Sequence, residues 1–186
     1  MPLAIGLLRH GDTGLSGFRG ALDDELAPLG WRQMEQAITG KEWDMVISSP
    51  RLRCAAFAQM LAARYGLPLH LDERLAEMHF GAWEGKTAAE LMQSDAEALQ
   101  NFWQDPERYP PPEGEHMEKF SARVLQAWSD IQQQCAGQRV LVVTHGGVIR
   151  RILCHVRGLP LGELLSLEVA HGSLHMSCPN GTEKTP

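Results

Sequence analysis

The chain has 186 residues, 44% of them hydrophobic, and a formal net charge of −6. This length and composition suit a protein with a sizeable buried core, and the negative charge disfavours a general nucleic-acid or anionic-membrane binder. The apolar run at 3–8 has no basic segment before it and is too short for a signal peptide or a membrane span. We therefore expect neither nucleic acid nor membrane as a partner.

Cysteine usage points to a reducing compartment. The four cysteines lie far apart with no Cys-x-x-Cys spacing, at Cys54, Cys135, Cys154 and Cys178. This spacing supports neither a disulfide framework nor a metal cluster, and the histidines are too scattered for a metal-ligand pattern. We expect reduced thiols, a cytoplasmic location, no metal and no cofactor.

The first half of the chain alternates short apolar runs with helical patterns. Residues 3–8 predict a buried strand, 12–24 a polar glycine-rich loop, and 31–39 a helix that Gly40 ends. A second strand is expected at 44–48, a helix at 51–65 ending at Gly66, and a third strand at 67–71. Residues 72–85 mix carboxylates with aromatic side chains and are less regular.

The second half continues the alternation. Helices are expected at 87–92, 96–103 and 115–135, with a proline-rich loop at 105–114. Residues 139–144 give a strong strand pattern, and a helix at 148–156 follows. Two late strands are expected at 165–169 and 173–177, and the tail after Pro179 should be loose.

This alternation predicts an α/β fold, a three-layer α/β/α sandwich with a mostly parallel central sheet. Neither an internal repeat nor a linker interrupts the pattern. We therefore expect a single domain over residues 1–186.

Two of the predicted strands end in similar tripeptides. The strand at 3–8 runs into Arg9, His10 and Gly11, and the strand at 139–144 runs into His145 and two glycines. The carboxyl ends of parallel strands meet at one edge of a sheet, where α/β proteins bind ligands. A third strand, at 44–48, is followed by a helix whose first turn carries Arg53. If these strands are neighbours, two guanidinium groups and two imidazoles surround one point.

Such a cluster suits a compact dianion, because arginine forks match phosphate oxygens. Nearby positive charge also keeps an imidazole neutral and nucleophilic, so a phosphoryl group held by Arg9, Arg53 and His145 could pass to His10 and then to water. The leaving alkoxide needs a proton. The spacing leaves its donor open between Glu73, Glu77 and Asp12.

Several motifs, in this order, resemble the histidine phosphatase superfamily, which has the phosphoglycerate mutase-like fold. They are Arg9-His10-Gly11, Ser48-Ser49-Pro50 with Arg53, Leu75-Ala76-Glu77-Met78 with Phe80-Gly81-Ala82-Trp83-Glu84-Gly85, and Val143-Thr144-His145-Gly146-Gly147. The resemblance covers residues 3 to about 158. It implies a metal-independent phosphatase with a small phosphorylated substrate. By this resemblance His10 is the phosphorylated nucleophile, Glu77 is the proton donor, and Arg9, Arg53 and His145 form the phosphate pocket.

Within the superfamily, residues 18–24 and 77–85 are most similar to the α-ribazole phosphatases of cobalamin biosynthesis. The resemblance thus implies hydrolysis of α-ribazole 5′-phosphate. The alternatives are a broad sugar-phosphate or nucleotide phosphatase, a small mutase-like enzyme, and a non-catalytic module that binds phosphorylated ligands. The chain departs from many members at Leu15, Ser16 and His116, where they carry Trp, Asn and Ser.

Other charged and imidazole side chains have less specific contexts. Arg51 is two positions from Arg53 and points in a different direction on a helix, so we expect it to be solvated or a partial contributor to the site. Glu84 competes with Glu77. Arg150 and Arg151 are expected on a solvated helix face. The remaining histidines are expected to be structural or loop groups, and substrate contact is the alternative for three of them: His79, His116 and His171.

Overall fold

The computed structural model describes residues 3–177, so the tail expected to be loose lies outside the described residues. A five-stranded sheet has the order β3-β2-β4-β1-β5. The strands are β1 (Ala4–Arg9), β2 (Met45–Ser48), β3 (Leu69–Leu71), β4 (Arg139–Thr144) and β5 (Leu174–Ser177). Only β5 is antiparallel to its neighbour, β1. The mostly parallel sheet is therefore confirmed.

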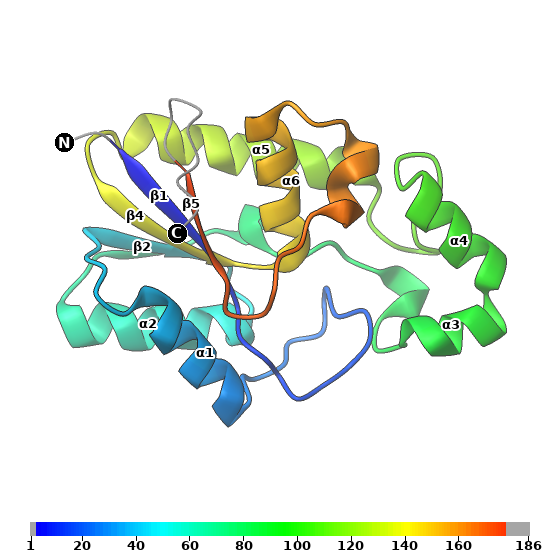
Figure 1. The fold of residues 1–186 in the computed structure, drawn as a ribbon, viewed down its shortest axis with the longest axis horizontal. Helices are drawn as coiled ribbons and strands as arrows, with labels where there is room; N and C mark the ends of the chain where they lie inside the picture. Colours follow the sequence, from blue (N-terminus) through cyan, green and yellow to red (C-terminus); the bar gives the residue numbers. More distant parts are fainter. Residues whose placement is uncertain (1–2, 178–186) are drawn as a thin grey trace.

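Helices cover both faces of the sheet. One side carries α1 (Pro28–Ile38) and α2 (Leu52–Tyr65), and the other carries α5 (Met117–Gln134) and α6 (Gly146–Arg157) (Figure 1). Two further helices, α3 (Ala88–Ser94) and α4 (Ala96–Gln104), lie together to one side of the sheet (Figure 1). This arrangement confirms the predicted α/β/α sandwich.

The residue alternation along β4 explains why helices pack on both sides. Val140 and Val142 belong to the core cluster that includes α5 and α6, whereas Leu141 and Val143 belong to the cluster with α1 and α2. All four side chains are fully buried. Successive side chains of a strand point to opposite faces, so a continuous apolar run is what a doubly covered strand requires.

The helices that flank the strand ends lie close to their expected positions, but α1 begins at Pro28 rather than at 31 and α6 at Gly146 rather than at 148. Pro28 occupies the first turn of α1, where its missing N–H costs nothing. Gly66 and Gly158 end α2 and α6 in the left-handed conformation, with φ of 64° and 66°. The irregular region at 72–85 contains two single-turn 3₁₀ helices, η1 (Glu73–Leu75) and η2 (Gly81–Trp83).

The strand expected at 165–169 is wrong. Residues Leu161–Ser166 form a 3₁₀ helix, η3, and an irregular segment leads from it to β5. Leu164 and Val169 are buried here, whereas Leu165 is 41% exposed. The apolar residues thus do not alternate between two faces, and β5 occupies the edge of β1 that another strand would need.

Candidate active site

The strand ends meet as the sequence predicts. In the parallel pair β1–β4, Arg9 lies opposite Thr144, so His10 and His145 follow side by side. The His10 N–H donates to the Thr144 carbonyl at 2.9 Å. The two imidazole rings are 5.2 Å apart between centroids, at 64° to each other. Both His-Gly motifs therefore stand at one edge of the sheet.

A cavity of about 500 Å³ opens at this edge. Four of the five predicted site residues line it: Arg9, His10, Arg53 and Glu77. The rest of the wall comes from the loop after β1, from residues 78–80, from α4 and α5, from the start of α6, and from residues 164–171. The fold thus brings together residues that are 68 positions apart in the chain, from Arg9 to Glu77.

His10 is held in a form that can act as a nucleophile. Its Nδ1–H donates to the Gly11 carbonyl at 2.9 Å, which leaves the lone pair on Nε2. Burial lowers the pKa of His10 to about 3, the Gly11 hydrogen bond opposes this, and Arg53 and Arg9 add to the lowering. The ring is therefore neutral at physiological pH.

Arg9 and Arg53 both line the cavity, and their guanidinium groups are held by hydrogen bonds to backbone carbonyls. Arg53, 1% exposed, donates from its terminal nitrogens to the carbonyls of Leu22 at 2.5 Å and Arg19 at 2.9 Å. Arg9 donates to the Val169 carbonyl at 2.5 Å. Within the described residues, the Nε atoms of both arginines are buried without a hydrogen-bond partner. Both arginines line the cavity, so an anion bound there would lie beside two positive charges.

His145 is fully buried behind His10 and does not itself line the cavity. Its Nε2 is 2.8 Å from the Ser49 hydroxyl and 3.7 Å from the Cys54 sulfur. Burial lowers the pKa of His145 well below its ordinary value, and it raises the pKa of the Cys54 thiol. The Cys54–His145 pair therefore has no thiolate to offer as a nucleophile.

Glu77 lies at the amino end of α6. Its carboxylate accepts the Gly147 N–H at 2.9 Å and the Met78 N–H at 3.0 Å. A side chain at Gly147 would meet Glu77 Oε1 at 2.3 Å, so the carboxylate needs this glycine. Arg123 fixes the segment by donating to the Ala76 carbonyl at 2.7 Å and the Glu77 carbonyl at 3.1 Å.

The competing carboxylates have other places. Glu84 accepts the backbone N–H groups of Gly20, Ala21 and Phe80 and so supports the loop that Arg53 contacts. Glu73 faces a shallow depression outside the cavity, as does Arg51, and Asp12 does not line the cavity. Among the four carboxylates considered as proton donors, Glu77 is the one at the cavity wall.

Two further cavity residues had little signal in the sequence. Arg150 was expected on a solvated face, but it is half-buried, lines the cavity and donates from Nε to the Leu167 carbonyl at 2.8 Å. The helix begins at Gly146, next to the cavity, and Arg150 lies one turn later on the same face. This spacing could have indicated that Arg150 lines the cavity. His171 also lines the cavity, with its ring 5.4 Å from that of His10, whereas His79 and His116 do not.

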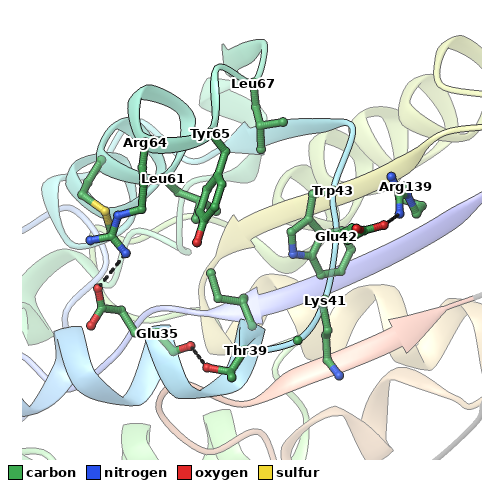
Figure 2. A pocket seen from close by; sticks show the side chains of 13 residues that line it. Glu35, Thr39, Lys41, Glu42, Trp43, Leu61, Arg64, Tyr65, Leu67 and Arg139 are labelled. Atoms are coloured by element: carbon green, nitrogen blue, oxygen red, sulfur yellow. Dashed lines mark hydrogen bonds and ion pairs between the residues drawn. The ribbon is translucent and has the colours of Figure 1, made fainter.

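A larger cavity of about 660 Å³ lies elsewhere, between the carboxyl ends of α1 and α2 and the start of β2. Figure 2 shows that four of its charged side chains form two ion pairs. Glu35 pairs with Arg64 at 3.3 Å, and Glu42 pairs with Arg139 at 2.6 Å. None of the five predicted site residues lines it, so size alone does not locate the chemistry.

Residues 3–177 contain no group of three or more His, Cys, Asp or Glu side chains placed to hold a metal ion. Nor does any helix in that range combine the length and the apolar character that crossing a membrane would take. The fold and the site together define a class: α/β proteins that gather guanidinium groups and a neutral imidazole at the ends of parallel strands.

Comparison with known proteins identifies the family. A profile of the Histidine phosphatase superfamily (branch 1) matches residues 5–185. The chain therefore belongs to the histidine phosphatase superfamily, and its class of reaction is the hydrolysis of phosphorylated small molecules.

Relatives in this superfamily differ in their named substrates. The adenosylcobalamin/alpha-ribazole phosphatase of Escherichia coli is 29% identical over 91% of this chain and 87% of its own. The glucosyl-3-phosphoglycerate phosphatase of Mycolicibacterium vanbaalenii is 32% identical over 83% of this chain and 74% of its own. The structure of Bacillus stearothermophilus YhfR superposes with a TM-score of 0.86, at 30% identity, over 98% of this chain and 94% of that chain.

Proposed function

We propose that this protein hydrolyses α-ribazole 5′-phosphate through a phosphohistidine on His10. The observation that carries the mechanism is the neutral His10 imidazole, its Nε2 lone pair free, in a cavity that Arg9 and Arg53 also line. An imidazole in this form attacks phosphorus, and guanidinium groups stabilise the charge on the phosphoryl oxygens.

The first step transfers the phosphoryl group. His10 Nε2 forms a bond to phosphorus while the bond from phosphorus to the ester oxygen breaks. Arg9 and Arg53 hold the phosphoryl oxygens, and a protonated Glu77 gives its proton to the leaving oxygen, so that a neutral alcohol departs. His145, buried against His10, is proposed to complete the phosphate pocket.

The second step returns the enzyme to its starting state. The Glu77 carboxylate accepts a proton from water, and the water oxygen bonds to phosphorus as the bond from phosphorus to Nε2 breaks. Inorganic phosphate leaves, His10 is again neutral, and Glu77 is again protonated. Every group in the cycle is a side chain, so we propose that a chelator leaves the rate unchanged.

The substrate proposal rests on an apolar part of the wall of the same cavity. This part is largely aromatic, formed by Phe18, Phe80, Phe102, Trp103, Met117 and Phe120. Trp103 is 43% exposed, so part of its ring is available to a ligand. A planar aromatic group such as the benzimidazole base of α-ribazole would pack against Trp103 and the partly exposed Phe18 and Phe80. The name of the Escherichia coli relative supports the same substrate.

The thiols support a cytoplasmic location as part of this proposal. Cys54, Cys135 and Cys154 are buried and free in the described structure. Free thiols persist in reducing compartments, whereas secreted proteins more often use theirs in disulfides.

A substrate panel tests the proposal. We expect kcat/KM for α-ribazole 5′-phosphate to exceed that for phosphoserine, a hexose phosphate and a purine nucleotide by more than about tenfold, which corresponds to about 1.4 kcal/mol. Trp103→Ala should reduce this preference, whereas Tyr65→Ala, an exposed aromatic residue of the other cavity, should not.

Each of the alternatives has its own outcome in this panel. Similar kcat/KM for all substrates would support the broad phosphatase, and transfer of phosphate between carbons of phosphoglycerate would support a mutase. Tight binding of a phosphoester with no release of phosphate would support the binding module.

A further inference from the structure

The segment between η3 and β5 supplies the hydrogen-bond acceptors that orient Arg9. Arg9 Nη1 donates to the Val169 carbonyl at 2.5 Å, and Nη2 donates to His171 Nε2 at 2.8 Å. Both terminal nitrogens of the guanidinium are thus held from one side by residues 169–171. Its Nε remains buried without a partner among the described residues.

The contact defines the state of the His171 ring. A guanidinium has only donors, so His171 Nε2 must present a lone pair and the ring must be neutral. A protonated ring would lose the acceptor and would place a second cation against Arg9. The hydrogen bond therefore exists in one protonation state of His171 and not in the other.

The backbone around His171 is tied to the site residues themselves. The Gly172 N–H donates to the His10 carbonyl at 3.2 Å, and the Arg9 N–H donates to the Ser173 carbonyl at 3.0 Å. Gly172 has a φ of 69°, and a side chain there would meet Gln33 Cβ at 2.6 Å. This anchoring fixes where the His171 ring stands relative to Arg9 and His10.

We propose that His171 is a positioning residue of this phosphatase, which accepts a hydrogen bond from Arg9 and thereby fixes the guanidinium that holds the phosphoryl group. The inference rests on the proposed role of Arg9 as a phosphoryl ligand. His171 lines the cavity, and its ring is 5.4 Å from that of His10. It is therefore close enough to the site to orient the Arg9 guanidinium.

Among the residues of the described structure, three charged or titratable groups face His171: Arg9, His10 and Asp12. Partial desolvation and the Arg9 charge lower the pKa of His171, and Asp12 opposes them. His171 is therefore neutral at physiological pH and becomes protonated on acidification. Its protonation releases Arg9, so the affinity for the phosphoryl group should fall on the acid side.

Two substitutions separate positioning from a structural role. His171→Ala removes the acceptor, and we expect KM and the inhibition constant of inorganic phosphate to rise about threefold to tenfold near neutral pH. His171→Gln places an amide oxygen about where Nε2 stands, so most of the loss should be recovered. His155→Gln, at an exposed histidine of α6, is the matched control and should behave as wild type.

The pH profile gives the second readout. Wild type should lose kcat/KM on acidification through a group that is missing in His171→Gln, because glutamine does not titrate. Equal thermal unfolding of all variants would show that the fold is intact, as expected for an exposed side chain.

Three results would overturn the inference. The first is an unchanged KM and phosphate inhibition constant in His171→Ala, and the second is a His171→Gln variant as impaired as His171→Ala. The third is a loss of kcat/KM on acidification that is the same in His171→Gln as in wild type. The proposed function has a separate test. If His10→Ala is inactive while the His171 variants match wild type, only the positioning role fails. If His10→Ala retains full activity, the phosphohistidine mechanism itself fails.

Discussion

At the scale of single residues, the site depends on an imidazole that stays neutral among guanidinium groups. The Gly11 carbonyl takes the proton on Nδ1, and burial makes the imidazolium form unfavourable. Arg150 adds a third guanidinium group close to that of Arg9. A Cβ atom placed on Gly146 would lie 3.1 Å from Arg150 Nη1 and 3.3 Å from Arg9 Cζ, so both groups border the same small space. An anion among these groups relieves their mutual repulsion.

Glu77 leads to a prediction about leaving groups. Glu77→Gln keeps the shape of the side chain but has no proton to give. We expect alcohol release in the first turnover to slow by about 10²–10⁴-fold for an alkyl phosphate, and far less for p-nitrophenyl phosphate, whose leaving group needs no proton. Glu73→Gln, outside the cavity, is the control. Equal losses for both substrates would contradict the role of proton donor.

At the scale of elements, α1 and the exit of β1 are in backbone contact. A side chain at Gly30 would meet the Asp12 carbonyl oxygen at 2.1 Å, and one at Gly11 would meet the Gly30 carbonyl oxygen at 2.1 Å. The Ala27 N–H also donates to the Asp12 carbonyl at 2.9 Å. The position of His10 is therefore set partly by how closely the helix approaches it.

Gly30→Ala should push α1 away from the strand exit. We expect a loss of about 1–3 kcal/mol in the free energy of unfolding, measured in urea, together with a lower kcat/KM. Gly162→Ala in η3 is the matched control, because within residues 3–177 no atom outside its own stretch of chain lies within 4 Å of the added carbon. If the two variants were equally stable and equally active, this contact would not position the site.

The sequence indicates the elements that carry the site better than the loops that complete it. Apolar runs and their polar ends predict β1 and β4, and with them Arg9, His10 and His145, because strand direction fixes where a following residue lies. His171 is reached only through the irregular segment after η3, where a strand was wrongly expected. Arg150 depends on which face of α6 meets the cavity, and this follows from packing rather than from local pattern.

At the scale of the whole molecule, both core clusters share one sheet, and we propose that residues 1–186 form one domain that unfolds in a single transition. Two buried neutral histidines then couple folding to pH. The folded pKa of His10 is about 3 against an ordinary 6.5, and that of His145 is also lowered. Between these values the unfolded chain binds more protons than the folded one.

Stability should therefore fall as pH decreases from 6.5 toward about 3. In this window each such histidine changes the free energy of unfolding by at most about 1.4 kcal/mol per pH unit. Above the pKa of the unfolded chain the stability is not reduced by either histidine. His10→Gln should show a shallower pH dependence of the unfolding free energy than wild type. Identical slopes would mean that His10 is not held neutral by the fold.

Trapping the phosphoenzyme is the most direct test of the mechanism. The enzyme is mixed with a phosphomonoester carrying labelled phosphate, quenched in alkali within the first turnover, and the labelled peptide is sequenced. We predict alkali-stable, acid-labile phosphate on His10 and none in His10→Ala. Phosphate on another residue, or turnover by His10→Ala at the wild-type rate, would contradict it.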